Sequence, residues 1–139
     1  MNSGSEIDTQ QGIQSILDRI VPGRYVCRER KGVGGSAIGK PVDLHILSTA
    51  SQKAIVAIEV ANVNTTQLVG ETCRLYYDSC SLKLLVLGDR NVPNGGKDQC
   101  KKLLAKLYGQ DDIRNTPARV VMYNDDSEIE VALRDLLLL

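Results

Sequence analysis

Apolar positions recur along this chain with two periods, one typical of helices and one typical of strands. Ile13, Leu17 and Ile20 fall on one helical face and Pro22 stops the pattern, which predicts a helix over about residues 8–20. Caps and apolar stripes predict three more helices: one capped by Thr65 or Thr66, one over about residues 96–108, and one capped by Ser127 with Glu130.

Five segments have the alternating or continuous apolar pattern of strands: residues 24–31, 42–48, 53–61, 82–88 and 118–123. A short polar turn joins 42–48 to 53–61, which predicts an antiparallel pair. The segment 82–88 is apolar on both faces, which predicts a central, parallel position in the sheet.

The predicted elements follow the order α-β-β-β-α-β-α-β-α, with no internal repeat and no linker long enough to divide the chain. With 139 residues, of which 42% are hydrophobic, the chain has about the length of one domain with one core. We therefore expect a single α/β domain over residues 1–139, with a mixed central sheet flanked by helices.

The formal net charge is zero, so no global field draws the protein onto nucleic acid or anionic lipid. A nucleic-acid partner must therefore be held by a local patch. One basic segment stands out, with a single acid, Glu29, among its cations: Arg24, Arg28, Arg30, Lys31 and Lys40. Phosphate contacts from these side chains would make binding salt-dependent. The alternative is that an edge strand carries charge to prevent aggregation.

The cysteines and the single histidine exclude several kinds of site. The four cysteines have neither CxxC spacing nor a neighbouring histidine cluster, so we expect reduced thiols and no zinc ribbon or disulfide scaffold. His45 is the only histidine; a lone strand histidine is more often packed than catalytic, but its place next but one to Asp43 keeps it a candidate.

The N-terminal segment has no basic start or apolar centre, and no segment approaches the roughly 20 apolar residues of a membrane span. We expect a soluble cytoplasmic protein that does not associate with membranes.

Two acids on the predicted antiparallel pair are candidates for a metal site. Side chains two apart on a strand share a face, and the hairpin would bring Asp43 close to Glu59. Converging carboxylates repel each other unless a cation lies between them, and their hard oxygens suit Mg²⁺ or Mn²⁺. In the alternative, Asp43 is a solvated acid near a turn and Glu59 pairs with a nearby lysine or arginine.

The segments "PVDLHIL" and "AIEVA" carry these acids on the second and third predicted strands, between a first helix and a second. This arrangement, over roughly residues 6 to 90, resembles the PD-(D/E)XK nuclease superfamily, which includes restriction endonucleases and Holliday-junction resolvases. The resemblance implies a restriction endonuclease-like fold and metal-dependent phosphodiester hydrolysis in DNA, favoured over RNA. It also implies a homodimer, with Asp43 and Glu59 as metal ligands.

The chain departs from the superfamily at Ala61, where the family has a lysine that positions or activates the attacking water. Our first candidate to replace it is Gln67, near the start of the following helix, and Lys40 is the second. Glu6 could supply the extra acid that some members carry. The hypothesis is a metal-dependent nuclease with an atypical active site; the alternative is a catalytically degenerate nuclease-fold domain that binds nucleic acid or assembles proteins.

Overall fold

The helices and strands of the structure follow the predicted order, with one short 3-10 helix added. The computed structural model describes residues 3–29 and 42–139. The helices are α1 (Ser3–Ile20), α2 (Thr65–Tyr76), α3 (Gly96–Leu107), the 3-10 helix η1 (Ile113–Asn115) and α4 (Asp126–Leu137). The strands are β1 (Tyr25–Glu29), β2 (Leu44–Ser48), β3 (Ala54–Ala61), β4 (Leu82–Leu87) and β5 (Ala118–Met122). Within these ranges, no helix has both the length and the apolar character needed to cross a membrane.

The strands form one mixed sheet in the order β1-β2-β3-β4-β5. The meander of β1, β2 and β3 is antiparallel, and β4 and β5 continue the sheet in parallel with β3. The predicted antiparallel pair and the predicted central, parallel strand are therefore both confirmed. The chain forms a single α/β domain with a five-stranded mixed sheet flanked by helices.

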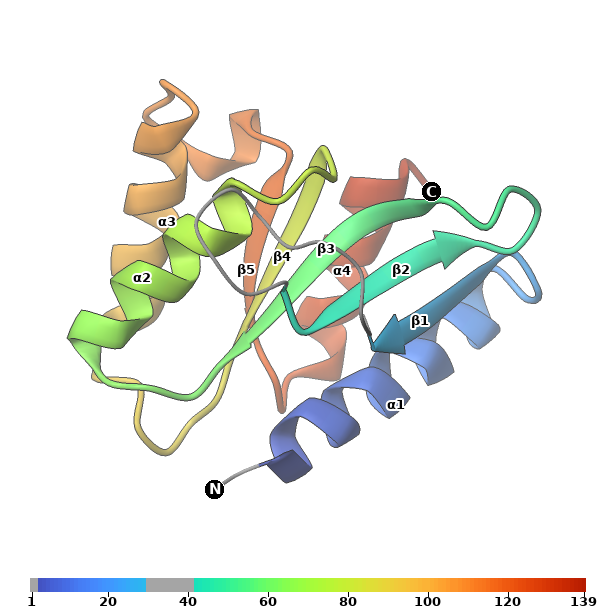
Figure 1. Ribbon diagram of the computed structural model, residues 1–139, viewed down its shortest axis with the longest axis horizontal. Helices are drawn as coiled ribbons and strands as arrows, with labels where there is room; N and C mark the ends of the chain where they lie inside the picture. Colours follow the sequence, from blue (N-terminus) through green and yellow to red (C-terminus); the bar gives the residue numbers. More distant parts are fainter. Residues whose placement is uncertain (1–2, 30–41) are drawn as a thin grey trace.

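Helices cover both faces of the sheet (Figure 1). On one face, α1 and α4 pack against alternate apolar side chains of β2, β3 and β4, such as Ile46, Ile58 and Leu84. On the other face, α2 and α3 pack against the intervening positions, such as Ala57 and Leu85. Burial on both faces explains why the apolar pattern of the central strands is nearly continuous.

Two helix caps differ from the sequence prediction. The helix α2 is capped by Asn64, whose side chain accepts a hydrogen bond from the backbone N–H of Gln67, and not by Thr65 or Thr66. The helix α4 is capped by Asp125, so the predicted box of Ser127 with Glu130 is wrong. In both cases the side chain that caps lies upstream of the predicted one, because the apolar stripe alone does not mark the first turn.

The helix α1 is also longer than predicted, since it begins at Ser3.

Lys83 breaks the apolar pattern of β4 and connects this strand to α2. Its side chain is only 2% exposed. Its ammonium donates hydrogen bonds to the backbone carbonyls of Leu75, Tyr76 and Asp78, at 2.9, 2.8 and 2.5 Å. A cation at the carboxyl end of a helix satisfies carbonyls that have no partner within the helix. Lys83 therefore fixes the end of α2 and the start of the following loop.

We expect Lys83→Met to lower the free energy of unfolding by about 3 kcal/mol, because buried carbonyls would lose a charged donor. Urea unfolding followed by circular dichroism measures the change. The control is Lys102→Met on α3, where the lysine is exposed and little change is expected. Equal effects of the two substitutions would contradict this role of Lys83.

Candidate functional site

Asp43 and Glu59 meet where β2 begins beside β3. The register pairs Leu44 with Ile58, which places Asp43 immediately before the ladder and beside the end of β3. An Oδ2 atom of Asp43 accepts a hydrogen bond of 2.8 Å from the backbone N–H of Val60. Asp43 thus extends the β2–β3 ladder by one bond through its side chain. Val42 lies outside the strand and packs on the α2 side of the sheet, opposite to Leu44.

Glu59 is the most deeply buried acid of this region and pairs with an arginine. Its side chain is 1% exposed. Its Oε2 atom lies 2.5 Å from the guanidinium of Arg74, which belongs to the last turn of α2. Arg74 also lies 3.5 Å from Glu71. The ion pair foreseen in the alternative interpretation of Glu59 is therefore present.

In the described part of the chain, the acidic cluster consists of Asp43, Glu59 and Glu71 around a single cation, Arg74. The Oε1 atom of Glu59 and the Oε2 atom of Glu71 are buried and have no hydrogen-bond partner among the described residues. Burial, and secondly the charge of Asp43, raise the pKa of Glu59 to about 8, although Arg74 opposes the shift. Burial also raises the pKa of Asp43 and of Glu71. The cluster has an excess of negative charge that a cation would relieve.

The residues considered as substitutes for the missing lysine lie in different places. Ala61 is fully buried, so its position offers no charge. Gln67 is exposed and lines a shallow surface hollow with Val63, Gly70, Glu71 and Arg74. The structure therefore brings Gln67 onto the same side of α2 as Arg74. Lys40 lies outside the described residues.

Glu6 lies in the first turn of α1. Burial is the main cause of its raised pKa, and the nearby charge of Asp43 raises this pKa further.

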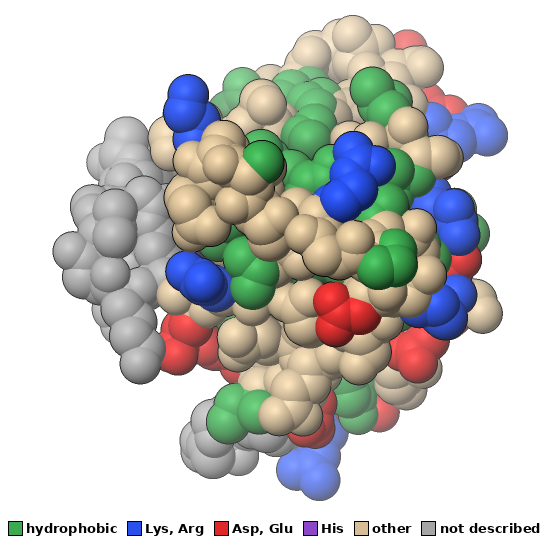
Figure 2. Space-filling view, turned by 90° about the vertical axis from the view of Figure 1, so that its right-hand side faces the viewer, with side chains coloured by type: hydrophobic (Ala, Val, Ile, Leu, Met, Phe, Trp, Pro, Cys, Tyr) green, Lys and Arg blue, Asp and Glu red, His purple; other side chains and the backbone are tan. Residues whose placement is uncertain are grey.

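Of the predicted nucleic-acid contacts, Arg24 and Arg28 are exposed, whereas Arg30, Lys31 and Lys40 lie outside the described residues. Arg28 pairs with His45 in the β1–β2 ladder, so it points to the sheet face that carries Ala57 and Glu59. Figure 2 shows one end of the molecule, where the Lys and Arg side chains of the described residues are interspersed with acidic ones and form no single patch.

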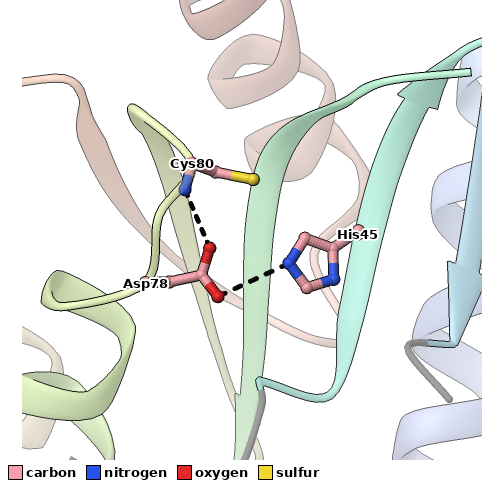
Figure 3. A group of neighbouring side chains, drawn as sticks. All are labelled: His45, Asp78 and Cys80. Atoms are coloured by element: carbon pink, nitrogen blue, oxygen red, sulfur yellow. Dashed lines mark hydrogen bonds and ion pairs between the residues drawn. The ribbon is translucent and has the colours of Figure 1, made fainter. Parts of the chain in front are cut away.

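A second polar cluster, not predicted from the sequence, lies just beyond the carboxyl end of α2. His45 on β2, and Asp78 and Cys80 in the loop before β4, are all buried, and one ligand atom of each lies within 4.8 Å of the others. Figure 3 shows the three side chains converging across β3. Among the described residues, these are the His, Cys, Asp or Glu side chains that form a group of at least three with ligand atoms close enough together to hold a metal ion.

Sequence reasoning missed four site residues: Glu71, Arg74, Asp78 and Cys80. A signal for Arg74 is its spacing of seven from Gln67, which places both side chains on one helical face. A signal for the second cluster is Lys83, a charge in a buried strand that requires partners nearby. Neither signal identifies the partner, because the contacts join elements that are distant in the sequence.

We expect the metal-free protein to become less stable as the pH rises from about 5 to about 8. The folded protein holds a proton on Glu59 with a pKa of about 8, whereas the unfolded chain releases it near the ordinary, lower pKa of glutamate. The stabilisation is therefore complete below the ordinary pKa and is lost through this window. In Glu59→Gln the side chain at this position is neutral at every pH, so the free energy of unfolding of this variant should vary less with pH.

Urea titrations in the presence of EDTA at several pH values measure this difference. Glu130→Gln is the control, since hydrogen bonds from Arg19 and Arg134 lower the pKa of Glu130 and its removal should not flatten the curve. Parallel pH curves for the wild type and Glu59→Gln would show that Glu59 is not protonated in the folded state.

Comparison with known proteins leaves the site to be interpreted from its own chemistry. A scan against protein-family models found no match, and a search of the curated proteins found no similar sequence.

Proposed function

We propose that this protein is a metal-dependent nuclease-like protein that hydrolyses phosphodiesters in DNA with an atypical active site. The observation that carries the proposal is the buried Glu59 carboxylate. One of its oxygens pairs with Arg74, and the other has no hydrogen-bond partner among the described residues. A buried carboxylate beside a second acid is stabilised by a divalent cation, and strongly perturbed acids are typical of functional sites.

The donor set fits Mg²⁺ or Mn²⁺. Asp43 and Glu59 would hold the ion through carboxylate oxygens, and Glu71 adds a third acid from α2. Mg²⁺ usually keeps several waters and needs only one or two protein carboxylates. When bound, such an ion supplies Lewis-acid chemistry and lowers the pKa of water.

Arg74 is the residue that we propose in place of the family lysine. The guanidinium of Arg74 reaches Glu59 from α2. The Arg74 side chain is 21% exposed and lines the hollow that Gln67 also lines. A fixed positive charge at this position would stabilise negative charge that develops on a phosphodiester. Gln67 would orient the substrate through its amide.

The DNA partner is proposed from the resemblance and from the exposed Arg28, which lies on the same sheet face as Glu59. Arg24 adds a second exposed cation at the start of this edge of the sheet. The proposal includes Arg30, Lys31 and Lys40 as further phosphate contacts, and it includes a homodimer that cuts both strands.

The ion pair itself favours a second candidate function. Arg74 already neutralises part of Glu59, and Asp43 already completes the ladder at Val60. Both acids therefore have structural roles that do not require catalysis. In this second candidate, the chain is a catalytically degenerate nuclease-fold domain that binds nucleic acid or assembles proteins.

We expect the wild type to bind Mn²⁺ in a calorimetric titration and to nick supercoiled plasmid with Mg²⁺ or Mn²⁺. Asp43→Asn and Glu59→Gln should each lower the nicking rate at least about 100-fold, because each removes a metal ligand. Asp126→Asn, which removes an exposed acid outside the cluster, is the control. Nicking that survives Glu59→Gln would identify a contaminant and contradict the proposal.

Arg74→Met separates the two candidate functions further. If Arg74 acts on the substrate, nicking falls while Mn²⁺ affinity stays the same or rises, since the guanidinium no longer competes for Glu59. Wild-type protein that binds DNA without nicking it would support the degenerate domain.

DNA retention by the wild type should weaken as salt increases, because phosphate contacts release counterions. Neutralising Arg28, Arg30 and Lys31 together should abolish retention in a filter-binding or gel-shift assay. Lys101→Gln with Lys102→Gln on α3 is the control for a general loss of positive charge. Retention that does not change in the first variant would contradict the proposed contacts.

A further inference from the structure

We propose that His45, Asp78 and Cys80 form a zinc site that is separate from the acidic cluster around Glu59. The two proposals are independent, because they use different side chains and different ligand chemistry. The inference follows from the positions of the three ligand atoms and from the way the sheet and the loop hold them.

The register of the sheet brings His45 to this loop. His45 pairs with Ala57 on β3, and Ala57 pairs with Lys83 on β4, so the three side chains share one face in a row across the strands. Ala57 is small and fully buried. The imidazole therefore passes over β3 and reaches Asp78 and Cys80 on its far side (Figure 3).

The separation of two of the ligand atoms matches a tetrahedral ion. The Nε2 atom of His45 lies 3.5 Å from the Oδ2 atom of Asp78. In a tetrahedral zinc site, bonds of 2.0 to 2.2 Å place a histidine nitrogen and a carboxylate oxygen about 3.4 Å apart. The Cys80 sulfur lies within 4.8 Å of one ligand atom of each of these two residues.

The loop that carries two of the ligands is well fixed. The backbone N–H of Cys80 donates to the Oδ1 atom of Asp78 at 2.9 Å, which leaves Oδ2 directed at His45. Lys83 holds the carbonyl of Asp78 from the other side. Its positive charge opposes a metal ion, but its donors point to three carbonyls rather than to the ligand atoms. Hydrogen bonds of this kind to the ligand residues orient the ligand atoms in metal sites.

The ligand types select the metal. A nitrogen, a carboxylate oxygen and a sulfur suit Zn²⁺, whereas Mg²⁺ prefers oxygen alone. Binding converts the Cys80 thiol to a thiolate bonded to the ion, and the proton is released to solvent. Three protein ligands leave a fourth position for water. A surface hollow lined by Tyr76, Asp78, Cys80 and Tyr108 reaches two of the three ligand residues.

A nucleophilic cysteine is the competing interpretation of the same residues. In a catalytic relay the acid and the thiol contact opposite nitrogens of the imidazole. Here Asp78 and Cys80 lie on the same side of the His45 ring (Figure 3). Cys80 is also buried, with 8% of its surface exposed. Convergence on one side of the ring favours metal ligation.

The experiment uses the full chain, freed of metal with a chelator and titrated with Co²⁺ and Zn²⁺. We expect one Co²⁺ per chain to give a thiolate-to-cobalt charge-transfer band that Zn²⁺ displaces. Cys80→Ser and Asp78→Asn should lower Zn²⁺ affinity at least about 100-fold. Asp78→Asn keeps an oxygen for the N–H of Cys80, so the loop should hold. Cys100→Ser, which changes another buried cysteine, should bind as the wild type does.

X-ray absorption at the zinc edge of the wild type tests the site without any substitution, in case a variant fails to fold. We expect one sulfur ligand together with nitrogen and oxygen ligands. A coordination shell without sulfur, a cobalt band retained in Cys80→Ser, or equal loss of the band in Cys100→Ser would each overturn the proposal. None of these measurements depends on nuclease activity.

Discussion

The position of α2 over three buried polar side chains of the sheet is the constraint on which the rest of the structure depends. His45, Glu59 and Lys83 all point to the face that α2 covers. A buried polar group without a partner costs several kcal/mol. Each partner comes from α2 or from the loop that follows it: Arg74 for Glu59, Asp78 for His45, and the last carbonyls of the helix for Lys83.

This arrangement also explains why charge is unevenly distributed beneath α2. Around Arg74 in the last turn of the helix, three acids face one guanidinium, and two of their buried oxygens have no partner among the described residues. At its carboxyl end, Lys83 is surrounded by carbonyl oxygens. The Lys83 end is balanced by fixed dipoles, whereas the acidic part requires a proton or a cation. A bound cation would therefore stabilise the protein more at Glu59 than at a position where every charge already has a partner.

Much of the fold could be predicted from the sequence, because the apolar pattern of each element is local. The order of elements, the antiparallel pair of β2 with β3 and the parallel position of β4 all follow from it. The approach of Asp43 to Glu59 also follows, since a hairpin register relates positions that are close in sequence. The partners from α2 and its loop could not be predicted in this way. Arg74 and Asp78 reach the sheet only because α2 crosses β3 and β4, and this packing is set by the whole core.

The two clusters share the carboxyl-terminal part of α2 and the residues that follow it. Ala57 and Glu59 are two residues apart on β3, which separates the row that contains His45 from Glu59 by roughly 7 Å. Arg74 belongs to the last turn of α2, directly before the residues whose carbonyls Lys83 holds. A ligand that fixes Asp78 and Cys80 would therefore also fix the end of α2 and the approach of Arg74 to Glu59. Since a guanidinium stabilises a carboxylate only at short range, the charge at Glu59 depends on where α2 places Arg74.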